Sequence, residues 1–179
     1  MPEPRASHVR KLVYASLFAA LTCVGAQAQI PFVSVPVTLQ TLFTLMAGAV
    51  LGPYFGALSM VVYVLLGLVG LPVFTGYRSG LGELAGPLGG YLVGFVVSAA
   101  VTGMIVKAKN EPGYLWICFA MAVGVVVIYA CGVPWLMLSD HMPLSQAVVV
   151  GALVFVPFDV LKIILGAYAT KKLRPKVAS

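Results

Sequence analysis

The sequence has 179 residues, of which 61% are hydrophobic and only 9% carry a charge. Because a water-soluble domain typically has about 25% charged residues, this composition excludes an ordinary soluble domain and is typical of a polytopic helical membrane protein. The net charge of +6 does not indicate a nucleic-acid partner, since the basic residues lie at the ends of the apolar segments. A single transmembrane domain over residues 1–179 is predicted.

Three membrane-spanning helices are predicted in the first half of the chain. The first covers about residues 11–28. Its basic flank and its final Ala-Gln-Ala would also suit a cleaved signal peptide, but the further apolar segments favour an uncleaved first helix. The second, at about residues 37–51, is short for a spanning helix of ~20 residues and ends at the tight turn Gly52-Pro53. The third covers about residues 54–71.

The second half of the chain contains three more predicted spans after a glycine-rich loop at residues 72–85. They cover about residues 86–106, 114–137 and 145–170. The predicted fold class is therefore an all-α membrane protein with six transmembrane helices.

The basic residues are distributed unequally between the two sides of these six spans. One side receives both termini, the Gly52-Pro53 turn and the loop at residues 107–113, whereas the other side holds Arg78 alone. Because basic residues concentrate in cytoplasmic loops, both termini are predicted to be cytoplasmic. The loops at residues 30–36, 72–85 and 139–143 are then external. The nine basic residues on the cytoplasmic side are Arg5, Arg10, Lys11, Lys107, Lys109, Lys171, Lys172, Arg174 and Lys176.

Small residues recur at intervals of four, which lets helix backbones approach closely in lipid. One series is Gly48, Gly52 and Gly56, and a second runs from Gly86 to Ser98. We expect both to pack inside the bundle. In the first span, Ala15 and Ala19, or Ser16 and Ala20, form a similar stripe. Spacing alone leaves open whether that stripe packs internally or against a partner subunit.

The sequence offers little for catalysis. It has no phosphate-binding loop, no Ser/His/Asp set and no paired carboxylates. The three cysteines, Cys23, Cys118 and Cys131, lie within apolar spans and have neither metal-ligand spacing nor neighbouring histidines. We therefore predict no enzyme, no metal and no cofactor.

Asp159 and Lys162 lie inside the last predicted span, in an otherwise apolar segment. An ionisable residue at membrane depth costs at least ~2.5–3.5 kcal/mol on insertion scales. Counted inward from Lys171 at ~1.5 Å per residue, Lys162 lies ~14 Å and Asp159 ~18 Å from the cytoplasmic end, near the middle of a ~30 Å core. Pro157 is predicted to kink the helix at this depth. Together these features indicate a polar site that faces the protein interior.

The pair has two interpretations. The three-residue spacing places Asp159 and Lys162 on one helix face, where they could simply neutralise each other. Burying two charges for stability alone often costs more than their attraction returns. A ligand that carries both hydrogen-bond donors and an acceptor would use both residues.

The predicted external side supplies further polar and aromatic residues. Thr38, Gln40 and Thr41 lie at the mouth of the second span, and Phe74 belongs to the glycine-rich loop. Arg78 is a candidate to bind a carboxylate because it is the single external basic residue. Alternatively, it is an interfacial charge paired with Glu83 or with a lipid headgroup.

Three segments carry a resemblance to a known family. They read VPVTLQTLFTLMAGAVLGPYFGALSMVVYVLLGLVGLPVF at residues 35–74, GLGELAGPLGGYLVGF at residues 80–95, and PFDVLK at residues 157–162. In this order and at these spacings they resemble the BioY family, the biotin-specific S components of energy-coupling factor transporters. The resemblance covers about residues 9–172.

The resemblance implies an S-component-like bundle in the plasma (inner) membrane of a prokaryote that binds biotin from outside. Such subunits dock with a transmembrane coupling subunit and two ATPase subunits, and small residues of the first helix contact the coupling subunit, which would favour that role for Ala15 and Ala19. Asp159 and Lys162 match the family's DxxK signature and would bind the ureido head or the carboxylate.

The chemistry of biotin suggests a more detailed hypothesis. Asp159 could accept from a ureido N–H and Lys162 could donate to the ureido carbonyl. Phe74 and Tyr91 could pack on the apolar rings. The valerate carboxylate could lie near Thr38, Gln40 or Arg78, although the ligand could also bind in the reverse orientation.

Three other functions remain open at this level. The chain could be an S component for another small vitamin-like substrate. It could be a membrane-embedded enzyme that uses Asp159 and Lys162 as acid and base, although the spans offer no further titratable partner. It could also be a scaffold with a structural ion pair, which would bind no small molecule.

Overall fold

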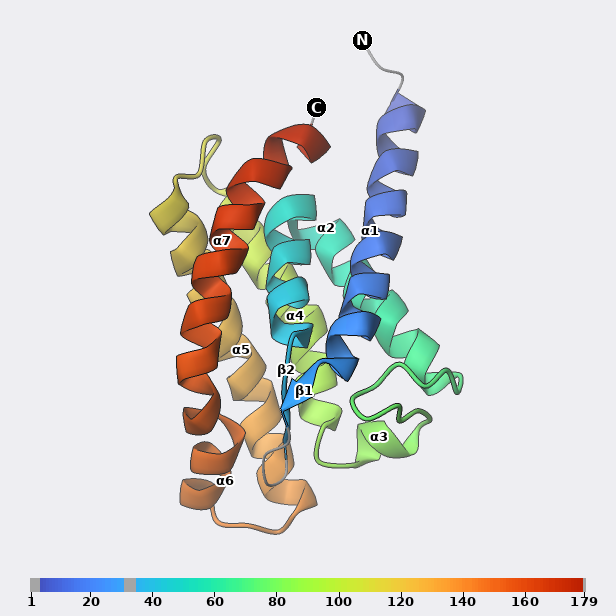
Figure 1. Cartoon of the computed structure of the whole chain (residues 1–179), viewed down its shortest axis with the longest axis vertical. Coiled ribbons are helices and arrows are strands. Elements are labelled where there is room, and N and C mark those ends of the chain that lie inside the picture. The colour runs from blue at the N-terminus through green and yellow to red at the C-terminus, as the bar shows by residue number, and fades with distance from the viewer. Residues whose placement is uncertain (1–3, 31–34, 179) are drawn as a thin grey trace.

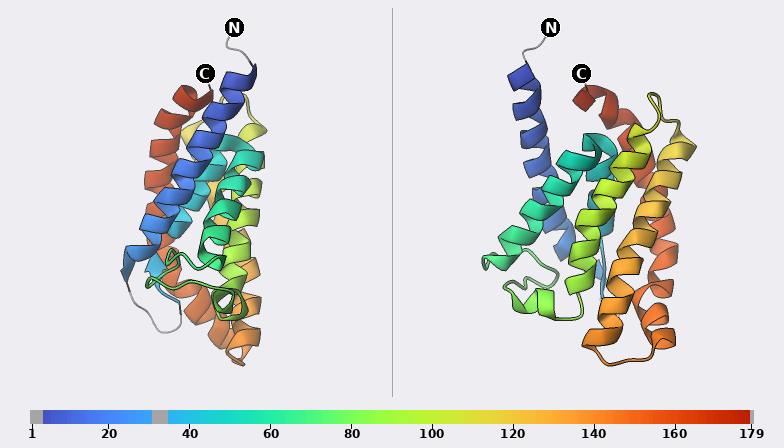
Figure 2. Two further views of the ribbon diagram at one scale, coloured as in Figure 1. Left: turned by 90° about the vertical axis from the view of Figure 1, so that its right-hand side faces the viewer. Right: turned by 180° about the vertical axis from the view of Figure 1, so that it is seen from behind.

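The computed structural model describes residues 4–30 and 35–178, which form a bundle whose long helices run roughly along one direction, except for the inclined second arm of α2 (Figures 1 and 2). Both chain termini lie at one end of the bundle, and a short β-ribbon and two short helices lie at the other. The helices are α1 (Pro4–Gln27), α2 (Gln40–Leu68), α3 (Gly82–Ala85), α4 (Gly89–Lys107), α5 (Tyr114–Ser139), α6 (Leu144–Gly151), the 3₁₀ helix η1 (Leu153–Phe155) and α7 (Val156–Ala178), and the strands are β1 (Gln29–Ile30) and β2 (Val37–Thr38).

Within the described residues, five helical segments are long and apolar enough to cross a membrane. One of the five is the whole of α2, and another combines α6, η1 and α7 as Leu144–Pro175. The protein is therefore a multi-pass helical membrane protein, as the composition predicted. The spans predicted at residues 86–106 and 114–137 correspond to α4 and α5, and the first predicted span lies in α1, whose candidate membrane segment is His8–Gln27.

α2 is bent in the middle rather than straight. Gly52 has φ 82° and ψ 179°, a conformation outside the helical region that glycine adopts without strain. Pro53 follows and begins the second arm, where its missing N–H costs nothing. The arms fold back on each other so closely that a Cβ at Gly56 would lie 2.6 Å from the Cα of Gly48. The predicted turn at Gly52-Pro53 thus joins two antiparallel arms (Figure 1).

Glycines also bring α4 against its neighbours, as the small-residue spacing predicted. A Cβ at Gly48 would lie 2.2 Å from the carbonyl oxygen of Ala99, and a Cβ at Gly90 would lie 2.3 Å from Cβ of Trp135. α4 therefore packs directly against α2 on one side and against α5 on the other. This close packing holds α4 in position, and residues of α4 line the cavity described below.

The span predicted over residues 145–170 lies within the candidate membrane segment Leu144–Pro175, but the interruption of its helix does not lie at Pro157. α6 ends at Gly151, Ala152 has φ −138° and ψ −61°, and a 3₁₀ turn leads into α7 at Val156. Pro157 does not kink a continuous helix, because it lies in the first turn of α7, where an N–H is not needed. The break therefore precedes Pro157, and Asp159 also lies in the first turn of α7.

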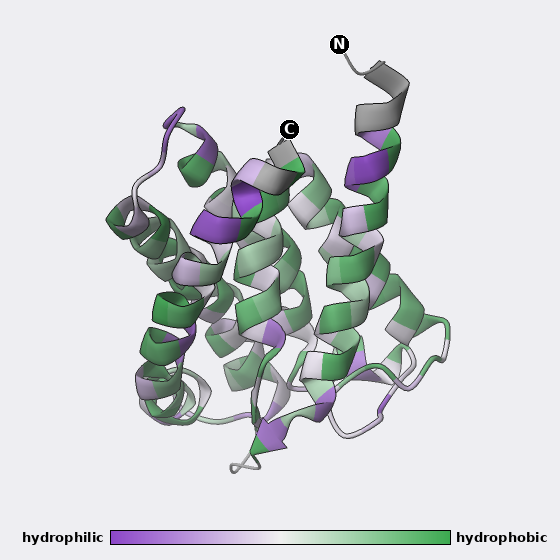
Figure 3. Ribbon diagram, turned by 45° about the horizontal axis from the view of Figure 1, so that its top comes forward, coloured by the Kyte–Doolittle hydropathy of each residue, from purple (hydrophilic) through white to green (hydrophobic). Residues whose placement is uncertain are grey.

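Hydrophilic residues gather at the two ends of the bundle (Figure 3). The ends of α1, α4 and α7 near the termini carry most of the described basic residues, from Lys11 to Arg174. At the other end β1 pairs with β2, with Gln29 opposite Thr38 and Ile30 opposite Val37. Residues 31–34 of the predicted loop at 30–36 lie outside the described residues.

Candidate functional site

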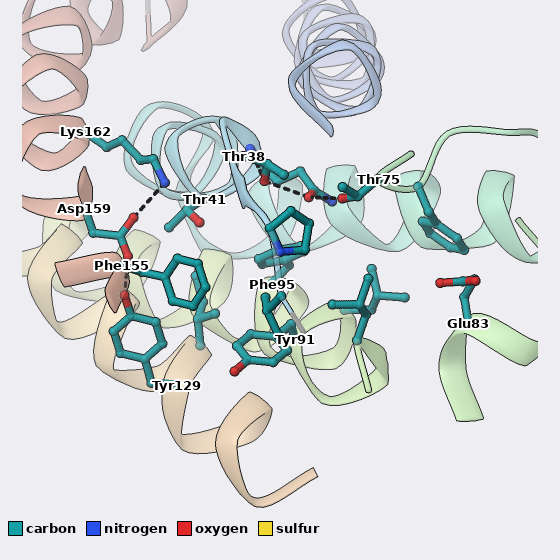
Figure 4. A pocket seen from close by; sticks show the side chains of 17 residues that line it. Thr38, Thr41, Thr75, Glu83, Tyr91, Phe95, Tyr129, Phe155, Asp159 and Lys162 are labelled. Carbon is teal, nitrogen blue, oxygen red and sulfur yellow. Dashed lines mark hydrogen bonds and ion pairs between the residues drawn. The ribbon is translucent and has the colours of Figure 1, made fainter. Parts of the chain in front are cut away.

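A cavity with about 620 Å³ of empty space, its open mouth included, lies among β2, α2, α4, α5, η1 and α7. Figure 4 shows Asp159 and Lys162 on one side of it, Glu83 on the other, and Tyr91 and Phe95 between them. The lining residues are Val35, Pro36, Thr38, Gln40, Thr41, Phe74, Thr75, Glu83, Leu88, Tyr91, Leu92, Phe95, Ile128, Tyr129, Phe155, Asp159 and Lys162.

The charged wall of the cavity is a buried ion pair. Nζ of Lys162 donates to Oδ1 of Asp159 at 2.8 Å, and the two residues are only 7% and 3% exposed. The hydroxyl of Tyr129, on α5, donates to the other carboxylate oxygen of Asp159. Asp159 also benefits from its place in the first turn of α7, because the positive end of the helix dipole stabilises a carboxylate. The break before α7 therefore creates this local environment.

A second polar cluster lies on the wall formed by β2 and the start of α2. Oε1 of Gln40 accepts hydrogen bonds from the hydroxyls of Thr38 and Thr75, each at 2.8 Å. The side-chain amide of Gln40 donates to the hydroxyl of Tyr63 at 2.6 Å. Because buried polar groups are costly without partners, this network fixes the amide of Gln40 in one orientation. Among the described residues, the second N–H of that amide has no partner, so it can donate to a ligand.

The part of the cavity between these clusters is apolar and aromatic. Phe74 is 1% exposed and meets the ring of Tyr63 edge to face. Tyr91 packs its ring on Gly132 and donates its hydroxyl to the carbonyl of Gly151 at 2.7 Å, which satisfies the end of α6. Both aromatic rings are thus fixed by their surroundings and present rigid apolar faces to the cavity.

Arg78 does not line the cavity. Its Nε lies 3.5 Å from Oε2 of Glu83 and donates to the carbonyl of Thr75 at 3.3 Å, and its side chain is 50% exposed. The structure therefore realises the alternative in which Arg78 pairs with Glu83, and it is Glu83 that reaches the cavity. The loop that carries both residues is tied to the end of α1, because the side chain of Gln27 donates to the carbonyl of Phe74 at 3.0 Å.

The predicted cavity residues are therefore brought together with one exception. Asp159, Lys162, Thr38, Gln40 and the two predicted aromatic residues all line it, and Arg78 stands at its rim. The two alanines of α1 lie elsewhere: Ala15 is 2% and Ala19 is 1% exposed, and both are packed in the core of this chain.

Sequence reasoning missed several residues of the cavity, above all Tyr129, Thr75 and Glu83. A tyrosine in an apolar span is common, so Tyr129 stands out only once its hydroxyl is seen to meet Asp159. Thr75 belongs to the loop after α2 and Glu83 to the short helix α3, and the sequence does not predict the path of this segment. The sequence therefore carries no clear signal for any of the three.

The arrangement is suited to binding rather than to catalysis. The cavity combines one mutually neutralised ion pair, an amide with fixed orientation and rigid aromatic faces. Both charged groups are already engaged by protein partners, which leaves them able to exchange or share hydrogen bonds with a polar, uncharged group. A small molecule with a polar head and an apolar body matches this lining.

Comparison with known proteins identifies relatives of the whole chain. The chain is 39% identical over 166 residues to the biotin transporter BioY of Thermotoga maritima, and the match covers 93% of this chain and 96% of that protein. It is 37% identical over 147 residues to a probable biotin transporter BioY of Pyrococcus horikoshii, covering 82% of this chain and 85% of that one.

The fold also has a solved counterpart. A crystal structure of the S-component for biotin from an ECF-type ABC transporter superposes with a TM-score of 0.87 at 28% identity, covering 98% of this chain and 95% of the other. The family model of the BioY family matches residues 1–179. A match over the full chain, together with relatives at this identity, shows that the chain belongs to the BioY family.

Proposed function

We propose that this chain is the membrane-embedded subunit that captures biotin for an ECF-type ABC transporter. Its family, its similarity to biotin transporters and its likeness to a solved S-component for biotin all support this function. The observation that carries it within the chain is the cavity in which the buried pair of Asp159 and Lys162 faces rigid aromatic rings. The chain is a transporter subunit and not an enzyme.

The ureido head of biotin fits the ion pair best. That head is uncharged and offers two N–H donors and one carbonyl acceptor, so Asp159 accepts from an N–H and Lys162 donates to the carbonyl. The ion pair and the ureido head then carry no net charge together, and the carboxylate of biotin lies away from them. The reverse orientation would bring a third charge, the carboxylate, beside Asp159 at membrane depth, and a buried uncompensated charge is strongly unfavourable.

The remainder of biotin extends toward the mouth of the cavity in this orientation. Phe74 and Tyr91 cover the apolar ring system, and Thr38 and Gln40 supply polar contacts near the mouth. Arg78 at the rim neutralises Glu83 and attracts the valerate carboxylate. Its half-exposed position suits a long-range electrostatic role better than a buried contact.

We further propose that the chain crosses the inner membrane of a prokaryote six times, with both termini cytoplasmic. The two arms of α2 supply two short crossings on either side of Gly52, and α6, η1 and α7 together supply the last. The excess of basic residues at the terminal end supports this orientation. The mouth of the biotin cavity then opens outward.

The coupling subunit and the two ATPase subunits supply the energy for transport. The predicted contact of Ala15 and Ala19 with the coupling subunit would require the two alanines, buried in this chain, to become accessible on docking. The neighbouring stripe of Ser16 and Ala20 is exposed in this chain and can receive a partner helix without rearrangement.

Calorimetric titration of the detergent-purified protein with biotin tests the proposed function. Saturable one-to-one binding is expected for the unaltered chain. Asp159→Asn and Lys162→Met should each weaken binding by at least about tenfold, since a loss of ~1.4 kcal/mol or more is ordinary for a hydrogen bond to a charged group. Lys109→Met, which changes a basic residue at the far end, should bind like the parent protein.

The double variant Asp159→Asn/Lys162→Met separates ligand contact from structural pairing. Each single variant leaves one buried charge without its partner and should lower the midpoint of thermal unfolding. The double variant leaves no unpaired charge and should recover much of the stability. Its biotin binding should stay weak. A stable double variant that binds biotin as tightly as the parent would overturn the assignment of the pair to the ligand.

A further inference from the structure

A second hollow lies at the end of the bundle that carries the chain termini, opposite the biotin cavity. It contains about 860 Å³ of empty space, its open side included. It is formed by α1, the bend of α2, the end of α4 and the end of α7 (Figure 1). The lining residues are Lys11, Ala49, Val50, Leu51, Gly52, Pro53, Tyr54, Phe55, Gly103, Val106, Lys107, Arg174 and Val177.

Three cations from three different helices face this hollow: Lys11 of α1, Lys107 of α4 and Arg174 of α7. Among the described residues, no carboxylate lines the hollow, and neither of the two ion pairs involves these cations. Nζ of Lys11 lies over the ring of Phe55, 5.9 Å from its centroid. Like charges gathered in one hollow repel one another unless an anion lies between them.

The backbone adds to the positive potential. Gly52 interrupts α2, so the second arm begins at Pro53 and directs the positive end of its dipole toward this end of the molecule. Arg10, which precedes Lys11 in α1 and does not line the hollow, has a buried Nε with no hydrogen-bond partner among the described residues. The hollow thus combines side-chain cations with the start of a helix, which is an arrangement that favours phosphate.

The apolar residues that line the hollow indicate which kind of molecule would carry the phosphate. Val50, Leu51, Val106 and Val177 are apolar and buried or nearly so, whereas Tyr54 is 69% exposed at the outer edge. A free phosphate ion would gain nothing from apolar walls. The phosphate of a membrane lipid would place its charge among the cations and its acyl chains along the apolar surface.

We propose that this hollow binds the phosphate headgroup of an anionic membrane lipid through Lys11, Lys107 and Arg174. The lipid neutralises the three cations and fills the space between α1 and α7, which are bridged by α2 rather than packed directly on each other. The site is separate from the biotin cavity and shares no lining residue with it.

Native mass spectrometry of the detergent-purified chain, titrated separately with phosphatidylglycerol, phosphatidylcholine and inorganic phosphate, tests the proposal. The parent protein should retain phosphatidylglycerol in preference to the other two. The triple variant Lys11→Gln/Lys107→Gln/Arg174→Gln should lose that preference by about 100-fold, since a basic residue near an anionic headgroup contributes about fivefold in affinity.

A matched control variant shows whether the lipid preference depends on the cations of the hollow or on the overall charge of this end of the protein. Lys109→Gln/Lys171→Gln/Lys172→Gln removes the same charge from the same end, and none of the three lines the hollow. Lys109 and Lys172 already contact the rings of Trp116 and Tyr168. This control should keep the lipid preference of the parent, and an equal loss in both triple variants would overturn the proposal.

The remaining outcomes are equally decisive. Displacement of the lipid by millimolar inorganic phosphate would show a simple anion site and contradict a lipid site. Loss of association with the coupling subunit in the triple variant, without any lipid preference in the parent, would assign the hollow to that partner instead. Biotin binding, measured on the same preparations, should be unchanged in both triple variants, so failure of this proposal is distinguishable from failure of the proposed function.

Discussion

The buried ion pair depends on a third residue, Tyr129. Its hydroxyl donates to one oxygen of Asp159 while Lys162 donates to the other, so each carboxylate oxygen has a protein partner. A buried carboxylate with both oxygens engaged is held in one position, and its remaining lone pairs point in fixed directions. We infer that Tyr129 positions Asp159 for the ligand.

Replacing Tyr129 by phenylalanine should therefore weaken biotin binding without removing it. A hydrogen bond to a charged group is worth ~1.5–3 kcal/mol. Only the fraction of this energy that orients Asp159 contributes to the binding free energy of the ligand. We therefore expect a decrease in affinity of about tenfold by calorimetry. Tyr114→Phe is the matched control, because Tyr114 lies on the same helix, donates to the carbonyl of Ile164 and does not line the cavity. Equal effects of the two substitutions would contradict the role of Tyr129.

The residues that sequence alone could identify are those that are costly in a membrane. Asp159 and Lys162 stand out because a charge in an apolar span requires an explanation. Tyr129 and Thr75 do not, because tyrosine and threonine occur throughout membrane helices and loops. The sequence left two roles open for Arg78, contact with a carboxylate of the ligand or pairing with Glu83, and the path of its loop places it beside Glu83.

The element that best explains the site is the interrupted last helix. The turn at Gly52-Pro53 could be predicted because glycine and proline adjoin there. The break at Ala152 could not, because its sequence carries no such signal and the carbonyl of Gly151 is satisfied by Tyr91, which is 60 residues away. Pro157 indicated the right region, but its preference for the first turn of a helix decides its exact place.

The glycine-rich loop is held against α2 by a contact that only glycine permits. A Cβ at Gly67 would lie 2.1 Å from the ring of Phe74, which lines the cavity and is 1% exposed. The ring must move if any side chain is added there. Gly67 thus links the packing of α2 to the shape of the biotin cavity.

Gly67→Ala should accordingly lower biotin affinity, because the methyl group drives the ring of Phe74 into the cavity. The double variant Gly67→Ala/Phe74→Leu should recover part of that affinity, since a smaller side chain leaves room for the methyl group. Gly82→Ala is the control, because a Cβ at that position meets no atom within 4 Å. Calorimetric titration of the three proteins measures the effect, and failure of the second substitution to recover any affinity would contradict steric transmission through Phe74.

The two hollows lie at opposite ends of the molecule and differ in the charge of their lining residues. The biotin cavity contains a neutralised pair and lies toward the end with the β-ribbon and α3, whereas the second hollow contains three cations and lies at the terminal end. Basic residues at a membrane protein's cytoplasmic surface face anionic lipid. In the proposed orientation, the cavity would open outward and the proposed lipid site would lie at the cytoplasmic surface.

Labelling of single cysteines in intact cells tests both the orientation and the number of crossings. In a chain whose Cys23, Cys118 and Cys131 are replaced by alanine, a membrane-impermeant maleimide should react with Asp140→Cys from outside. It should react with Asn110→Cys only after the membrane is permeabilised. Tyr54→Cys, beside the bend of α2 and 69% exposed in the parent, should behave like Asn110→Cys if the two arms meet at the cytoplasmic surface, as the proposed topology requires. If α2 crossed the membrane as one helix, position 54 would lie in the hydrocarbon core and would stay unlabelled even after permeabilisation, which would contradict six crossings.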